Sequence, residues 1–246
     1  MPFTFSHPAL VLPLAKYSGR YFSLTGLIIG SLCPDFEYFF RMKVESLVSH
    51  TAGGLFYFNL PVSILLAFVF HNLIRNYLYN NLPTICSSRL AVFTAFDWNN
   101  YFRQHYPTVI ISVLIGATSH LLWDSFTHLH GYSVQKIRVL QIAIETPIGI
   151  MLPVYKLLQH LSTCLGGLVI LLAFLRLPTG QLNQYRISLT YWLLVLLITS
   201  SIVCIRFTIE PSHNYLGNLI VTGISAGVIA LGISPLLMHT KASIMS

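Results

Sequence analysis

Residues 107–128 read PTVIISVLIGATSHLLWDSFTH, a long apolar run that ends in three ionisable side chains. About 20 apolar residues in an α-helix cross the roughly 30 Å hydrocarbon core of a bilayer. His120, Asp124 and His128 follow at four-residue intervals, so on a helix they form a slowly winding stripe. Ionisable groups in or beside hydrocarbon are costly unless they are paired, ligated or hydrated. The stretch therefore predicts a spanning helix that carries a polar, metal-binding site at one face of the membrane.

The composition of the whole chain agrees with a membrane protein. Of its 246 residues, 54% are hydrophobic and only 9% are charged, whereas soluble domains contain about 25% charged residues. Four further apolar windows approach the length of a span, at 51–74, 160–177, 188–206 and 217–237. Two shorter pieces, 21–33 and 139–153, are interpreted as half-helices, re-entrant segments or interfacial helices.

These windows predict an all-α integral membrane protein, a bundle of five to seven transmembrane or re-entrant helices. No repeat or linker divides the chain, so we expect a single helical membrane domain over residues 1–246. The formal charge of +7 comes from fourteen Lys and Arg residues that are scattered singly. That pattern suits anionic lipid headgroups better than nucleic acid, and we expect membrane lipids as partners and no nucleic acid.

The order of the spans predicts that distant polar residues reach the same face of the membrane. His50 directly precedes the first window, and the stripe at 120–128 closes the second, so both lie on one side. Asp35 and Glu37 precede His50 on that side. Glu145 joins them if the piece 139–153 does not cross.

Imidazole and carboxylate groups together suit zinc, iron, manganese and similar divalent ions, and zinc is usual in hydrolytic sites. His50, His120 and Asp124 are the predicted ligands. Asp35 or His7 supplies a further ligand or holds one in place. A bound divalent ion lowers the pKa of water to about 7 and polarises a carbonyl or phosphoryl oxygen, which indicates hydrolysis. Glu37 or Glu145 is the predicted general base.

Other interpretations of the same residues stay open. His120 and Asp124 can form a structural polar pair inside a bundle, and His128 can be an ordinary interfacial ring. Asp35 can cap a helix, and Glu145 can be a solvated helix end. Two functions follow. One is a hydrolase that cleaves an ester or phosphoester bond of a lipid-like substrate. The other is a transporter or ion-binding protein whose polar residues line a pathway.

Four separated motifs also carry a family resemblance: MPFTFSHP at 1–8, GSLCPDFEY at 30–38, SHT at 49–51 and GATSHLLWDSFTH at 116–128. In this order they resemble the bacterial membrane proteins grouped as domain of unknown function 4184. The resemblance extends through YKLLQH at 155–160 and so covers about residues 1–170. Over residues 171–246 the chain resembles the family only in its hydrophobicity.

The layout is similar to that of membrane-bound metal-dependent hydrolases of the bacterial inner membrane. That similarity implies a location in the bacterial plasma membrane. It also implies a metal site at Asp35, His50, His120 and Asp124, with His7 and His128 as additions.

Overall fold

The structure is a computed structural model, and it describes residues 3–146, 149–180, 187–210 and 215–244. Helices account for 78% of it. Five of them are long and apolar enough to cross a membrane: Leu55–Asn80, Trp98–Lys136, Val154–Leu175, Leu189–Ile209 and Leu216–Met238. The predicted all-α, multi-pass class is confirmed.

The chain divides into two compact units. The first comprises Met1–Asp35, Val48–Ile64 and His105–Arg176, and the second comprises Phe36–Leu47, Leu65–Gln104 and Leu177–Ser246. Every predicted site residue except Glu37 falls in the first unit.

The first unit begins with short helices and ends with a spanning one. Its elements are the 3-10 helices η1 (Thr4–Leu10) and η2 (Leu12–Tyr17), α1 (Leu24–Leu32), the 3-10 turn η3 (Cys33–Asp35), the π-helix η4 (Leu55–Asn59) with the start of α3 (Leu60–Val69), most of α6 (Trp98–Thr127), α7 (Tyr132–Lys136), the 3-10 helix η7 (Arg138–Gln141), strands β1 (Ala143–Glu145) and β2 (Met151–Pro153), and α8 (Val154–Leu175).

Helix α6 is interrupted where its apolar run begins. His105 has non-helical angles, φ −131° and ψ 28°, two residues before Pro107. Proline lacks an N–H and its ring clashes with the preceding turn, so a helix bends there. The apolar part of α6 therefore starts at Pro107, where the sequence predicted it.

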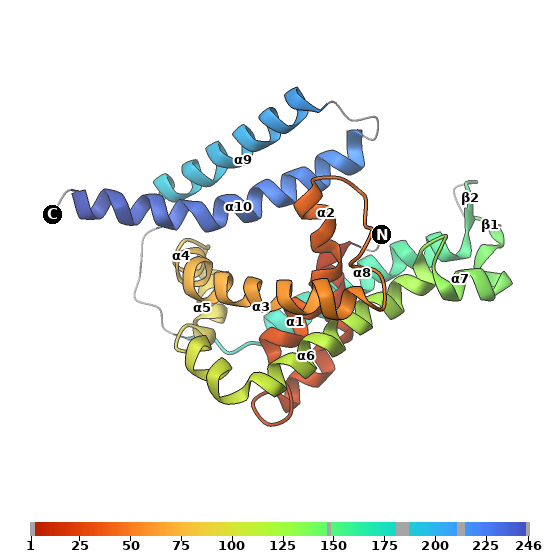
Figure 1. Cartoon of the computed structure of the whole chain (residues 1–246), viewed down its shortest axis with the longest axis horizontal. Coiled ribbons are helices and arrows are strands. Elements are labelled where there is room, and N and C mark those ends of the chain that lie inside the picture. The colour runs from red at the N-terminus through yellow and green to blue at the C-terminus, as the bar shows by residue number, and fades with distance from the viewer. Residues whose placement is uncertain (1–2, 147–148, 181–186, 211–214, 245–246) are drawn as a thin grey trace. The chain divides into compact units, whose positions relative to one another are not determined.

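Helices α1 and α6 cross in backbone contact (Figure 1). Gly26 and Gly30 on α1 repeat the small-xxx-small spacing that allows helices to approach closely. A Cβ at Gly30 would overlap the carbonyl oxygen of Val113, and a Cβ at Gly116 would overlap the carbonyl oxygen of Leu27. The crossing therefore requires glycine on both helices.

The two short apolar pieces behave differently. Helix α1 has 9 residues and is about 13.5 Å long, too short to cross, in agreement with a half-helix. The helical interpretation of 139–153 was wrong, because this piece forms η7 and the antiparallel pair β1–β2. Gly149, with φ +77°, adopts a conformation that favours glycine at the turn. Residues 147 and 148 lie outside the described residues.

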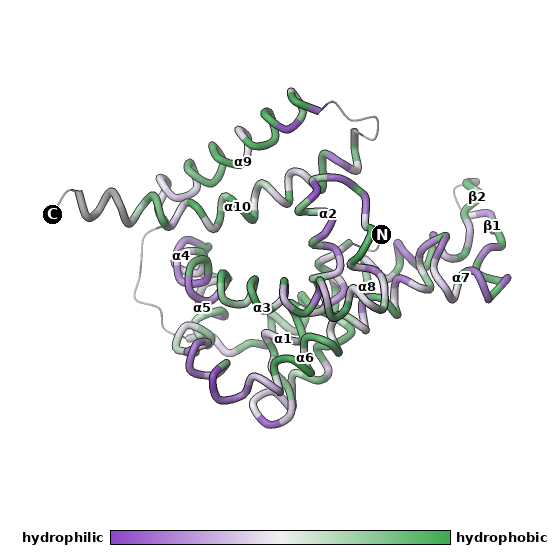
Figure 2. Tube along the Cα trace, viewed as in Figure 1, coloured by the Kyte–Doolittle hydropathy of each residue, from purple (hydrophilic) through white to green (hydrophobic). Residues whose placement is uncertain are grey.

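The second unit contains α2 (Phe36–Arg41), the rest of α3, the π-helix η5 (Phe70–Ile74), α4 (Arg75–Asn80), α5 (Thr84–Leu90), the 3-10 helix η6 (Ala91–Phe93), α9 (Leu189–Ile209) and α10 (Tyr215–Ile244). Helices α9 and α10 lie side by side (Figure 1), and apolar residues predominate on both (Figure 2). The hydroxyl of Ser225 on α10 donates to the carbonyl of Phe39 on α2 at 2.7 Å.

Candidate metal centre

Four ionisable side chains from three parts of the sequence meet inside the first unit. Asp35 ends η3, His50 lies in the segment before η4, and His120 and Asp124 lie one turn apart on α6. Each offers one ligand atom, and these atoms all lie within 4.8 Å of one another. We call these four residues the metal cluster. They are four of the six residues predicted to hold a metal.

The close crossing of α1 and α6, which requires glycine on both helices, positions His120. Gly116 lies one turn before His120 on α6, and Gly30 directly precedes Ser31 on α1. The ring atom Nδ1 of His120 lies 2.7 Å from the carbonyl oxygen of Ser31. Because a carbonyl only accepts, Nδ1 carries a hydrogen, and Nε2 is the ring nitrogen that faces the two carboxylates. A backbone partner of this kind is typical of metal-binding histidines.

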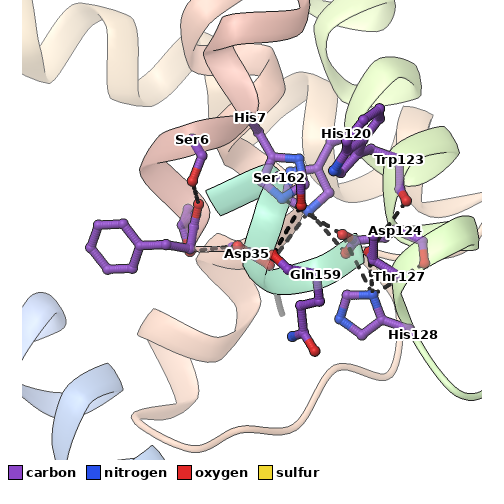
Figure 3. Close-up of polar contacts among 12 residues, drawn as sticks. Ser6, His7, Asp35, His120, Trp123, Asp124, Thr127, His128, Gln159 and Ser162 are labelled. Carbon is purple, nitrogen blue, oxygen red and sulfur yellow. Dashed lines mark hydrogen bonds and ion pairs between the residues drawn. The ribbon is translucent and has the colours of Figure 1, made fainter. Parts of the chain in front are cut away.

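Asp35 is fully buried and is held by Thr4. The Thr4 hydroxyl donates to Oδ2 of Asp35 at 2.5 Å. The other oxygen, Oδ1, faces Nε2 of both His50 and His120, and Figure 3 shows Asp35 beside His120. Burial would raise the pKa of Asp35, but His120 and His50 lower it below its ordinary value. The group is therefore a carboxylate.

The distances within the cluster suit a shared cation better than direct hydrogen bonds. Nε2 of His120 lies 3.5 Å from Oδ1 of Asp35 and 3.3 Å from Oδ2 of Asp124. Nε2 of His50 lies 3.6 Å and 3.5 Å from the same two oxygens. Good N–H···O bonds measure about 2.7–3.2 Å. Bonds of about 2.0–2.1 Å to a tetrahedral ion place its ligands about 3.3–3.4 Å apart.

Several buried atoms of the cluster have no hydrogen-bond partner among the described residues. Oδ1 of Asp35 and Nε2 of His120 are two of these atoms. A buried polar atom without a partner costs about 1–3 kcal/mol, and the cost is greater for a charged group. A divalent ion would satisfy both atoms at once, so the residues present fit a metal.

His50 is the least buried member of the cluster, with 23% of its side chain exposed. Its Nδ1 lies 3.0 Å from the hydroxyl of Ser49, so Nε2 turns toward the carboxylates. Asn59, at the end of η4, donates from Nδ2 to the carbonyl of Ser49 at 2.8 Å. The π-helix thus holds the segment that carries His50.

His7 and His128 contact the other oxygen of Asp124. Nε2 of His7 lies 3.6 Å and Nδ1 of His128 lies 3.5 Å from Oδ1 of Asp124 (Figure 3). The His7 ring also stacks on His120, with 3.6 Å between ring centroids. Burial, reinforced by His120, lowers the pKa of His7 to about 3, so its ring is neutral. Both residues flank the cluster, and their role as ligands stays a prediction.

The two predicted general bases have other surroundings. Oε1 of Glu37 accepts from Nε of Arg41 and from the backbone N–H of Leu47, each at 3.0 Å, and Oε2 accepts from Ser46 at 3.0 Å. These contacts lie within the second unit. Glu145 is an exposed residue of strand β1. Neither belongs to the metal cluster, and their catalytic roles stay predictions.

Sequence reasoning missed the residues that hold the cluster in place. Thr4 and Ser31 bond to the ligands, and Asn59 supports the segment with His50. One signal was present, because the spacing of Gly26 and Gly30 marks a helix-packing face. Thr4 and Asn59 carry no comparable signal, since their partners are distant in the sequence.

The family described as "Domain of unknown function (DUF4184)" matches residues 1–236. The chain belongs to this family. The resemblance of the motifs is thereby confirmed, and it reaches well past residue 170, where only hydrophobicity had indicated it. No curated protein and no solved structure matches the chain.

Proposed function

We propose that this member of the family is a metal-dependent hydrolase that cleaves an ester or phosphoester bond of a lipid-like substrate at one face of the bacterial plasma membrane. The observation that carries the proposal is the metal cluster. Two imidazoles and two carboxylates are gathered in a buried place at the spacing of ligands around one ion.

The donor set favours a divalent ion, with zinc as the first candidate. Nitrogen and oxygen ligands of this kind bind zinc, manganese and iron. Asp35, His50, His120 and Asp124 would hold the ion. Bound there, it would lower the pKa of a water to about 7 and polarise a carbonyl or phosphoryl oxygen. Four protein ligands fill a tetrahedral zinc site, so hydrolysis at zinc requires a fifth position, as zinc enzymes can adopt.

The residues of the chain account for the remaining needs of such a site. The Thr4 hydroxyl and the Ser31 carbonyl orient Asp35 and His120. His50 is the most exposed member of the cluster, so its side is the proposed approach for a water or a substrate oxygen. Glu37 and Glu145 remain the proposed proton acceptors.

Elemental analysis of detergent-purified protein tests metal binding. We expect about one equivalent of divalent metal in the wild type and its loss in His120→Ala, because the substitution removes a buried ligand. His130→Ala is the matched control, since His130 is exposed and lies just after α6. Equal, substoichiometric metal in all three proteins would refute the proposal.

Hydrolysis is tested with a panel of carboxylic and phosphoric ester substrates in detergent micelles and in liposomes. Activity should disappear in metal-free protein and return when the metal is added back, but it should not return in His120→Ala. Stoichiometric metal without turnover of any ester would contradict catalysis and would favour an ion-binding or transport role.

A further inference from the structure

A pocket of about 200 Å³ adjoins the metal cluster within the first unit. It lies between η1, α6 and α8, and its lining includes His7, Leu10, Trp123, Ser162, Leu165 and Val169. Pockets for drug-sized ligands measure about 300–1,000 Å³. This pocket is smaller, so it suits a slender chain better than a bulky ring system.

One end of the pocket reaches the metal cluster through His7. The His7 side chain is almost fully buried, and neither ring nitrogen has a hydrogen-bond partner among the described residues. The ring stacks on His120 and lies 3.6 Å from Asp124. A group at this end of the pocket is therefore separated from the metal ligands by one imidazole. Figure 3 shows His7, Trp123 and Ser162 around this end.

The other end of the pocket opens among apolar side chains on the surface of the first unit. Leu10 is 39% exposed, Leu165 is 60% exposed and Val169 is 44% exposed. Leu165 and Val169 belong to α8, a spanning helix of which only 17% of the apolar window is buried inside the protein. In a membrane, such a surface faces acyl chains. The mouth of the pocket therefore opens toward hydrocarbon.

The side chains along helix α8 change from polar to apolar at the level of the pocket. Its first turns contain Lys156, Gln159 and His160, and the residues from Cys164 to Leu175 are apolar apart from two glycines. Ser162 and Val169 stand on either side of this boundary. Gly166 lies against η1 at the same level, because a Cβ there would come within 2.8 Å of the Ser6 side chain. The polar end of the pocket and the cluster thus share one side of the boundary.

We propose that this pocket, the acyl pocket, binds one acyl chain of a membrane lipid that enters sideways from the bilayer. The chain lies along Leu165 and Val169, and the polar end of the lipid meets His7 beside the metal cluster. The proposal rests on the proposed function for the bond that is cleaved, but lipid binding itself does not require cleavage. A water-soluble substrate would not use a mouth that opens toward hydrocarbon.

Photolabelling in nanodiscs tests the acyl pocket. The probe is a phospholipid with a diazirine next to the ester carbonyl of one acyl chain, so that the reactive group lies at the polar end of the pocket, and labelled residues are identified by peptide mass spectrometry. We expect label on Trp123 and Ser162 in the wild type. Val169→Trp fills the pocket, and labelling of these two residues should be lost.

Leu168→Trp is the matched control. Leu168 adjoins Val169 in the sequence, is half exposed and lies outside the pocket. It should leave the labelling of Trp123 and Ser162 unchanged. Leu172, exposed on the same helix, reports ordinary lipid contact and should be labelled equally in all proteins. The metal content of Val169→Trp should equal that of the wild type, which shows that the variant is folded.

The outcomes separate this proposal from the proposed function. Pocket labelling that Val169→Trp abolishes supports the acyl pocket even if no ester is hydrolysed. Label confined to Leu172 and similar surface residues overturns the acyl pocket, even if the protein hydrolyses water-soluble esters. Equal labelling of Trp123 in wild type and Val169→Trp, with metal retained, also overturns it.

Discussion

Substitution of Gly116 by alanine should weaken metal binding although this residue contacts no ligand. The new Cβ would overlap the carbonyl oxygen of Leu27 and lie 2.7 Å from the backbone nitrogen of Ser31. Carbon atoms pack best at about 3.5–4.0 Å from their neighbours. Helices α1 and α6 would therefore have to separate by about 1 Å.

The magnitude of the effect follows from the spacing of the ligands. Oδ1 of Asp35, which follows α1, lies 3.5 Å from Nε2 of His120 on α6. A separation of about 1 Å extends this distance to about 4.5 Å, whereas two bonds of about 2.1 Å span at most about 4.2 Å. Lost support of a metal ligand typically costs 10–100-fold in affinity. We expect a loss in this range, and overpacking should lower stability by about 1–3 kcal/mol.

The assay is metal titration against a chromophoric chelator, together with thermal unfolding in detergent. The matched control is Gly167→Ala on α8, because a Cβ at Gly167 meets nothing within 4 Å. Alanine there should leave metal affinity unchanged and stabilise the helix by up to about 1 kcal/mol. Wild-type affinity and wild-type melting temperature in Gly116→Ala would refute the role assigned to the crossing.

Three further predictions concern the same unit. Thr4→Val removes the hydrogen bond to Asp35 and should cost about 1–3 kcal/mol of stability and about tenfold in metal affinity, while Thr4→Ser should retain both; equal affinities for the two variants would contradict this role. Removal of the metal by a chelator should lower the melting temperature, because an ion at about 1,000 times its Kd stabilises by about 4 kcal/mol, and His120→Ala should show no shift with chelator. Asn59→Ala removes the hydrogen bond to the carbonyl of Ser49 and should weaken metal binding about tenfold in the same titration. An unchanged affinity would show that η4 does not position His50.

Residues near one another in the sequence were the most predictable part of the site. His120 and Asp124 are four residues apart on a helix, and their atoms lie 3.3 Å apart in the structure. The order of the spans also correctly predicted that Asp35 and His50 would approach them. These inferences needed only helix geometry and the cost of ionisable groups in hydrocarbon.

Other features depend on contacts that no local pattern encodes. Two of the three interpretations of the apolar piece 139–153, a half-helix and an interfacial helix, were wrong, since hydropathy does not distinguish a short hairpin from a short helix. Glu37 is only two residues from Asp35, yet its carboxylate bonds to Arg41, Ser46 and Leu47. These contacts belong to the second unit, whereas Asp35 belongs to the first, and the short sequence distance does not reveal this division.

The amino-acid sequence by itself determined that this is a multi-pass helical membrane protein with a few costly polar residues, because spans are long and apolar and each unpaired charge in hydrocarbon carries a large penalty. Only the tertiary structure decided which of those residues meet and what holds them. Helices α1 and α6 approach through glycines, Thr4 folds back onto Asp35, and a pocket opens beside His7. The contact between Ser31 and His120, for example, joins residues 89 positions apart. Such contacts arise from packing in three dimensions, which the order of residues along a helix does not specify.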